Sequence, residues 1–155
     1  MATFPYTFSP NTRIKSAEVN ANNNAAWPTN WTDFVPTWTS PGGNPSIGGG
    51  TFTANHHQVG KLVTAQYHIS IGIGTNVGAA YWVLGFPVTV VGSPNPTGCW
   101  EAYCAGAYYH GGIELLSSTT FILPVSGGTN YVGLNQPGIW ANGNWIIISV
   151  NLEVA

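Results

Sequence analysis

Charged side chains are scarce in this chain. Of its 155 residues, five are Asp or Glu and three are Lys or Arg, so that 5% are charged and the formal net charge is −2. An ordinary soluble domain carries about 25% charged residues. Three basic residues cannot form the positively charged face that nucleic acid requires, and we therefore expect no nucleic-acid partner.

Long apolar runs are also lacking. No run approaches the roughly 18 apolar residues of a membrane-spanning helix, and we expect no membrane partner. The first residues, MATFPYTFSPNTRIKS, lack a basic start followed by an apolar stretch, so we expect no signal peptide. Disordered chains are poor in aromatic residues, whereas 13% of this sequence is aromatic. The sequence therefore predicts a folded domain.

Cysteine is limited to Cys99 and Cys104. The pair could be reduced structural thiols or a disulfide, and both alternatives stay open. A zinc site would need two further ligands. The histidines lie at scattered positions without metal-ligand spacing: His56, His57, His68 and His110. We therefore predict neither a metal site nor a cofactor.

Glycine, proline, asparagine, threonine and serine supply most of the polarity, a composition typical of short strands joined by turns. Alternation is clearest in two segments, 61–73 and 144–154. The inner faces predicted for them are Val63, Ala65, Tyr67, Ile69, Ile71 and Ile73 in the first, and Ile146, Ile148, Val150, Leu152 and Val154 in the second. Further strands are predicted at 34–39, 51–57, 80–91, 99–110, 113–116 and 119–123. We predict an all-β fold, a jelly-roll-like β-sandwich over residues 34–155.

Residues 1–33 differ from the rest and are predicted to form an N-terminal attachment arm. Pro5 and Pro10 favour an extended start. One short helix is predicted at 17–26, because Ser16 is a good N-cap and Glu18 suits the first turn. Its many asparagines make it marginal in isolation, so we expect it to need a partner surface.

The five carboxylates give little support for catalysis. Glu101 and Glu114 could meet across paired strands, as the two acids of a glycosidase do. Asp33 is the one aspartate available to a Ser-His-Asp triad, and it lies in the predicted arm. The glycines at 48–50 precede a strand pattern, where a phosphate loop would precede a helix. We therefore predict no catalytic residue and no enzyme.

An aromatic cluster is the main candidate for contact with a partner. It consists of Trp100, Tyr103, Tyr108, Tyr109 and His110. Three roles stay open for it: core packing, a subunit interface, or stacking on a glycan. In an unbroken strand Trp100 would face away from Tyr103 and Tyr109. The scarcity of charge favours a surface that is covered by other chains over a monomer solubilised by Asn, Thr and Ser.

Two sets of motifs resemble proteins of tailed-bacteriophage virions. Residues 8–22, FSPNTRIKSAEVNAN, resemble the pattern F-x-P-x-T-x-I-x-S-x-E-V-N-x-N-F of certain virion N-termini, although Asn23 replaces the final Phe. VPTWTS at 35–40, PSIGGGTFT at 45–53, VGKLV at 59–63 and FPVT at 86–89 resemble a small β domain of phage tail and surface proteins. Gly49 stands where that pattern usually has Asn.

The resemblance implies a homotrimeric structural protein on the virion surface, a capsid decoration or head-fibre protein. Its arm would dock on another virion protein of the capsid or tail. The residues that the resemblance assigns to attachment are Phe8, Pro10, Thr12, Ile14, Ser16, Glu18, Val19, Asn20 and Asn22. The alternative is a minor tail or receptor-binding protein that attaches to the host through a surface glycan.

Overall fold

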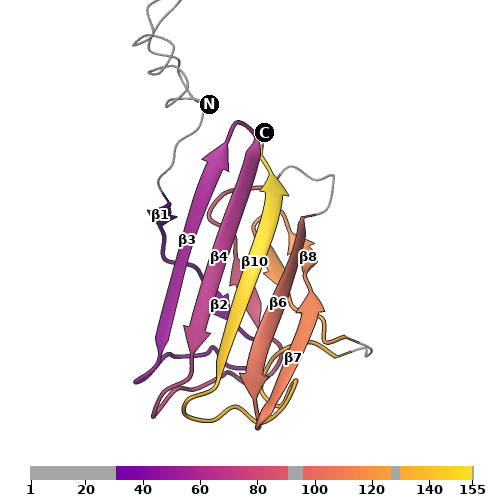
Figure 1. The fold of residues 1–155 in the computed structure, drawn as a ribbon. Helices are drawn as coiled ribbons and strands as arrows, with labels where there is room; N and C mark the ends of the chain where they lie inside the picture. The colour runs from indigo at the N-terminus through magenta and orange to yellow at the C-terminus, as the bar shows by residue number, and fades with distance from the viewer. Residues whose placement is uncertain (1–30, 91–95, 127–129, 155) are drawn as a thin grey trace, which may run out of the picture.

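The chain folds into two antiparallel β-sheets that pack face to face as a β-sandwich (Figure 1). The computed structural model describes residues 31–90, 96–126 and 130–154. Within these ranges no helix occurs. The predicted helix at 17–26 and the attachment residues lie outside them. The ten strands are β1 (Thr32–Asp33), β2 (Trp38–Thr39), β3 (Thr51–Val59), β4 (Leu62–Ser70), β5 (Val83–Gly85), β6 (Thr97–Cys104), β7 (Ala107–Gly112), β8 (Glu114–Ser117), β9 (Thr120–Ile122) and β10 (Trp145–Glu153).

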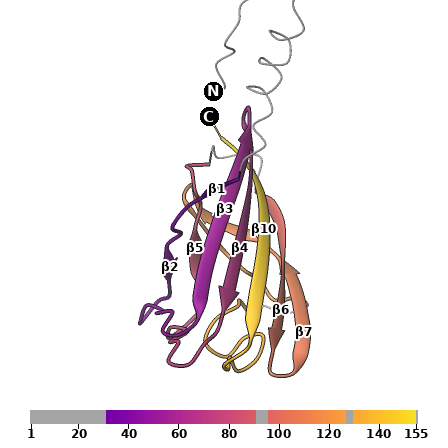
Figure 2. The ribbon, with the colours of Figure 1, turned by 60° about the vertical axis from the view of Figure 1, so that its left-hand side comes forward.

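The larger sheet has six strands in the order β1-β3-β4-β10-β6-β7, and the smaller has four in the order β2-β5-β9-β8. Figure 2 shows β2 and β5 as a separate layer to the left of β3, β4 and β10. The last strand, β10, returns to the middle of the larger sheet and pairs with both β4 and β6. The long strands at 51–59, 62–70 and 145–153 are therefore neighbours, and their alternating patterns share one inner face.

The two strongest alternating segments were predicted on the correct faces. Val63, Ala65, Tyr67 and Ile69 are almost completely buried, and so are Ile146, Ile148, Val150 and Leu152. Ile73 is the exception, because its side chain is 80% exposed. Strand β4 ends at Ser70, and the chain then turns at Gly72–Thr75, so the alternation no longer describes the backbone there.

Several predicted strand boundaries were wrong. Of the strand expected at 34–39, only Trp38–Thr39 is a strand, β2 of the smaller sheet, whereas β1 precedes the expected range and belongs to the larger sheet. Pro36 lies between them and has no backbone N–H to donate to a ladder. The strand expected at 80–91 is reduced to Val83–Gly85, and the one expected at 99–110 is a hairpin that turns at Ala105–Gly106.

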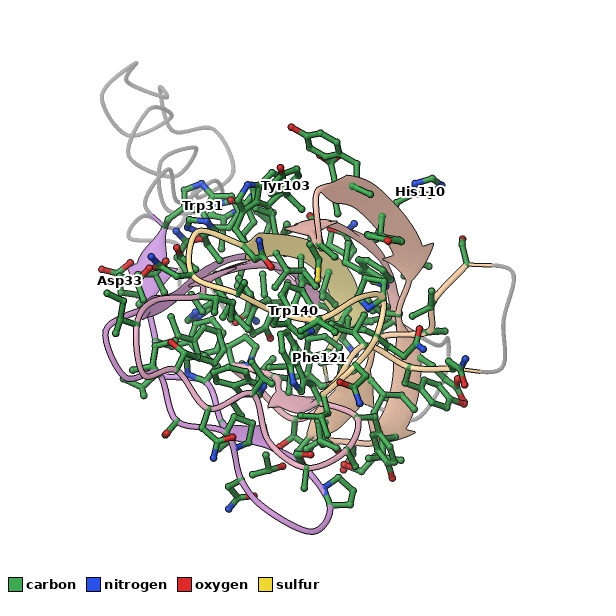
Figure 3. All side chains as sticks on the ribbon, turned by 90° about the horizontal axis from the view of Figure 1, so that it is seen from below. Trp31, Asp33, Tyr103, His110, Phe121 and Trp140 are labelled. Atoms are coloured by element: carbon green, nitrogen blue, oxygen red, sulfur yellow. The ribbon has the colours of Figure 1, made fainter. Side chains whose placement is uncertain are left out.

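Aromatic side chains fill the space between the sheets. The Trp82 ring stacks on Trp140 with centroids 4.9 Å apart, and it meets the edge of Trp38 at 4.9 Å. Phe121 contacts Tyr67, whose hydroxyl donates a 2.9 Å hydrogen bond to the Gly85 carbonyl. This bond links β4 of one sheet to β5 of the other. Figure 3 shows Phe121 and Trp140 between the layers.

The PSIGGGTFT segment packs against the turn after β4. The backbone N–H of Gly49 donates to the Ile73 carbonyl at 2.9 Å, and the Thr75 hydroxyl donates to the Ile47 carbonyl. A Cβ atom at Gly50 would overlap the Ser70 carbonyl oxygen. This part of the motif therefore has a structural role, because the close approach of two backbones requires glycine.

Candidate interaction surface

The candidate interaction surface is the outer face of the six-stranded sheet, the side that points away from the smaller sheet. The register places one row of side chains across its centre, in the order Thr53, His68, Ile147, Glu101 and His110. Thr53, His68, Glu101 and His110 are exposed, and the Ile147 side chain is 49% exposed. The centre of the face therefore presents an aliphatic side chain among histidines, a hydroxyl and a single carboxylate.

Two shallow hollows flank Ile147 on this face. One, of about 340 Å³, is lined by residues of β6, β7 and β10, among them Cys99, Glu101 and His110. The other, of about 230 Å³, is lined by residues of β3, β4 and β10, among them Asn55 and His68. Ile147 contributes to both hollows, so it forms a ridge between them. A ridge beside a hollow is a shape that a second copy of the same surface can complement.

The aromatic cluster is divided between the core and the outer face. Trp100 is 1% exposed, and its indole N–H donates to the Pro124 carbonyl at 3.1 Å. Tyr109 packs against the same core. Tyr103, Tyr108 and His110 instead lie on the outer face, where the Tyr108 side chain is 68% exposed. Figure 3 shows Tyr103 and His110 at the periphery of the molecule.

The expected orientation of Tyr109 relative to Trp100 was wrong. The turn at Ala105–Gly106 folds β7 back on β6, so that Tyr109 pairs with Ala102 and shares the inner face with Trp100. Only Tyr103 faces away from Trp100, as expected. An odd sequence offset predicts opposite faces only along a single continuous strand, and here the chain reverses between the two residues.

Trp145 joins the outer aromatic residues, and it was not included in the aromatic cluster. The Tyr103 and Tyr108 rings have centroids 5.2 Å apart, and the Tyr108 and Trp145 centroids are separated by 6.1 Å. The three side chains lie in one row, because Trp145 pairs with Tyr103 and Tyr103 pairs with Tyr108. The alternation of 144–154 placed Trp145 on the outer side, but only the strand order brings it beside Tyr103.

Asn55 carries a buried polar atom on the outer face. Its Oδ1 has no hydrogen-bond partner among the residues that the structure describes. Buried amide oxygens nearly always accept a hydrogen bond, so this oxygen is an acceptor that a donor of another molecule could reach if the Asn55 side chain turned toward the surface. It lines the smaller of the two hollows beside Ile147.

Both cysteines are free thiols, so the disulfide alternative is excluded. Cys99 is exposed on the outer face, whereas Cys104 is buried in the core. Their odd spacing on β6 directs them to opposite sides of the sheet. Burial raises the pKa of the Cys104 thiol, against the opposing effect of a hydrogen bond from the Gly138 backbone.

The carboxylates considered for catalysis are far apart in the fold. Glu101 lies on β6 of the larger sheet beside His110, and Glu114 lies on β8 of the smaller sheet. Asp33 pairs with Asn55 at the β1 edge. In ranges 31–90, 96–126 and 130–154, no group of three or more His, Cys, Asp or Glu side chains could hold a metal ion. The same ranges contain no helix long and apolar enough to cross a membrane.

Comparison with known proteins gives no relative: no protein-family model, no curated protein and no solved structure matches this chain.

Proposed function

We propose that this chain is a structural protein of a tailed-bacteriophage virion, a homotrimer that decorates the capsid or forms a head fibre. The residues that precede β1 would dock it on another virion protein, at the virion surface. The observation that carries the proposal is the outer face of the six-stranded sheet, which exposes Ile147 and Tyr108 and has one carboxylate, Glu101, at its centre, with Asp33 and Glu153 toward its margins.

The size of this face suits a stable subunit interface. The six strands range from two residues in β1 to nine in β3, β4 and β10, and at about 3.3 Å per residue and about 4.8 Å between strands they cover on the order of 700 Å². A standard protein interface buries about 800 Å² on each partner. Covering most of this face is therefore enough for a specific complex. Head-to-tail contacts, in which one surface of each copy meets a different surface of the next copy, can close into rings such as trimers.

The hollows on the face favour a second copy as the covering molecule. Ile147 can enter the hollow beside Glu101 and His110 on the next subunit, and in a three-fold ring each copy would both insert and receive one side chain. A hydrogen-bond donor of the neighbouring copy can also satisfy Asn55 Oδ1. Such an interface is formed by apolar contact and a few hydrogen bonds, as the low charge of the chain requires.

The described part of the chain begins at one end of the sandwich. Strand β1 pairs antiparallel with β3 through Thr32 and Asp33, so Trp31 lies toward the end of the sheet where β3 finishes. Trp31 contacts the His57 ring, with centroids 5.9 Å apart. An arm that leaves at this end would leave the opposite loops free to project from a particle.

The alternative is a minor tail or receptor-binding protein that contacts a host glycan. The exposed Tyr108 beside Trp145 favours it, because an aromatic side chain in this position can stack on a sugar.

We also propose that the two sheets form a jelly-roll-like sandwich. The return of β10 to a place between β4 and β6 supports it, since such long returns are typical of Greek keys.

Electron microscopy of particles that carry the tagged protein tests the location. Density at local three-fold or five-fold positions of the capsid is expected, and density confined to the tail would favour the alternative. Deletion of residues 1–26 should leave a folded domain that no longer joins particles. Incorporation of the truncated protein at the wild-type level would contradict docking through the arm.

Sedimentation velocity on the purified chain tests the interface. A trimer is expected, and Ile147→Asp should convert it to a monomer because the substitution places an unpaired negative charge beside Glu101 at the centre of the contact. Ile73→Asp is the matched control, since Ile73 is an exposed isoleucine outside the sheet. A wild-type monomer, or a trimer that tolerates Ile147→Asp, would refute this interface.

A further inference from the structure

A second concave surface, the tyrosine pocket, lies away from the outer face. It has a volume of about 300 Å³ and is formed by residues 79–81 before β5 and by residues 130–136 before β10. The Tyr81 side chain is 36% exposed, whereas the neighbouring Trp82 is fully buried. Tyr81 therefore points away from the core, into the pocket that Tyr131 also lines.

Backbone hydrogen bonds hold the two segments of the pocket together. Trp82 N–H donates to the Val132 carbonyl at 2.8 Å, and Leu134 N–H donates to the Ala80 carbonyl at 3.1 Å. The indole N–H of Trp140, in the core below, donates to the Gly133 carbonyl at 2.8 Å. A Cβ atom at Gly133 would overlap the Ala80 carbonyl oxygen, so glycine is required at this contact. The pocket is thus formed before any ligand arrives, which lowers the entropic cost of binding.

The pocket combines two aromatic rings with several amide groups. The Tyr81 and Tyr131 centroids are 5.8 Å apart and the rings are inclined at 51°, so the rings do not stack face to face. Asn130, Asn135 and Gln136 supply side-chain amides, each with donors and an acceptor. The Tyr131 hydroxyl donates to the Glu114 carboxylate, and this bond raises the pKa of Tyr131. The tyrosine rings offer apolar surface, and the amides can form hydrogen bonds with the hydroxyl groups of a cyclic ligand.

We propose that the tyrosine pocket binds a neutral hexopyranose, the sugar unit of a glycan without charged groups. Tyr81 would contact the apolar C–H face of the sugar ring, while the three amides bind its hydroxyls. The proposal is independent of where the protein sits on a particle and of its oligomeric state, because the pocket lies off the outer face of the larger sheet.

Charge selects neutral sugars over acidic ones at this site. Glu114 is the nearest charged group that the contacts identify, and it would repel a carboxylate or sulfate on the ligand. Lys61 is the one Lys or Arg after residue 33 in the sequence. It adjoins Leu62, at the start of β4, whereas the loop that leads to Tyr81 follows the other end of that strand. Within 31–90, 96–126 and 130–154, no Lys or Arg is therefore placed to pair with an acidic sugar.

The position of the pocket suits a ligand presented by another surface. Residues 71–82 follow the end of β4, and residues 131–144 precede the start of β10, so both lie at the lower end of the sandwich in Figure 1. The chain enters β1 from the opposite end. A protein anchored through its N-terminal residues would therefore hold the pocket toward the outside.

Saturation-transfer NMR on the full chain tests the site with D-glucose, D-galactose, D-mannose and N-acetyl-D-glucosamine, and with D-glucuronate as the acidic counterpart. At least one neutral sugar should bind with a Kd on the order of 1 mM, and D-glucuronate should bind at least about tenfold more weakly. Absence of binding by all four neutral sugars, or equal binding of D-glucuronate, would overturn the proposal.

Substitutions then locate the binding surface. Tyr81→Ala should weaken binding of the sugar at least about tenfold, whereas Tyr81→Phe should retain it because the ring remains. Asn135→Ala, at an exposed position, provides a second variant and should weaken binding about threefold. Val35→Ala, at a position that is 97% exposed and lies in neither surface, is the control and should bind as the wild type does. Tyr108→Ala distinguishes the outer face: loss of binding in Tyr108→Ala with retention in Tyr81→Ala would place the sugar there and refute the pocket.

Discussion

Two adjacent isoleucines on β10 provide the sharpest test of the structure. Ile147 and Ile148 are chemically identical and next to each other in the sequence, but Ile148 is fully buried between the sheets and Ile147 is 49% exposed on the outer face. Truncating each to alanine therefore removes the same atoms from two different environments. Comparing the losses of stability in the two variants shows which side of the larger sheet packs in the core.

The expected losses of stability differ severalfold. Ile148→Ala removes a fully buried side chain from a close-packed core and should lower the free energy of unfolding by about 2–5 kcal/mol. Ile147→Ala removes a side chain that is already half in water, so its cost to one subunit should be about 1 kcal/mol. In a trimer, Ile147→Ala should also weaken the association of the subunits directly. Ile148→Ala should affect association only indirectly, by lowering the fraction of folded subunits.

Urea unfolding of both variants measures these differences. The measurements should be made at two protein concentrations, because the stability of an oligomer rises with concentration while that of a monomer does not. Ile148→Ala should show the larger loss at the lower concentration. Equal losses for the two variants at a concentration where the chain is monomeric would mean that both faces of β10 are buried to the same extent, and the arrangement of the two sheets would be refuted.

Three further predictions follow from buried polar groups and the cysteines. Burial raises the pKa of Tyr67 far above its usual value of about 10, so ionisation of this group favours the unfolded chain and the free energy of unfolding should fall as the pH rises above about 10. In alkaline unfolding curves, Tyr67→Phe should make this fall with pH less steep. An unchanged dependence on pH would contradict the prediction. At concentrations where the chain is monomeric, iodoacetamide should alkylate Cys99 rapidly and Cys104 only on unfolding, as mass spectrometry would show, and equal rates would contradict their opposite orientations. Trp140→Phe removes the donor to the Gly133 carbonyl and should cost about 1–3 kcal/mol in thermal unfolding, with no loss if that bond is absent.

The sequence was most informative where a strand is long and half-buried. Residues 62–70 and 145–153 alternate because one side of each strand meets the core and the other meets water, so the inner faces could be predicted from the order of residues alone. The outward orientation of Trp145 followed from the same alternation. The predictions failed where the strands are short or interrupted, since Pro36 and the turn at 105–106 break the period that the argument needs.

The candidate surfaces depended on contacts between distant segments. Ile147, Glu101 and His68 share a row only because β10 inserts between β4 and β6, which no local pattern encodes. Tyr81 and Tyr131 come together because two loops at one end of the sandwich exchange backbone hydrogen bonds across fifty positions of sequence.

The sequence by itself determined the all-β class, the polarity of the long strands and the scarcity of charge, because composition and a period of two residues are local properties. Tertiary structure decided which exposed side chains are neighbours, which cysteine is buried and where the concave surfaces lie. These features depend on strand order and on the packing of one sheet against the other, and both are set by the balance of contacts over the whole chain.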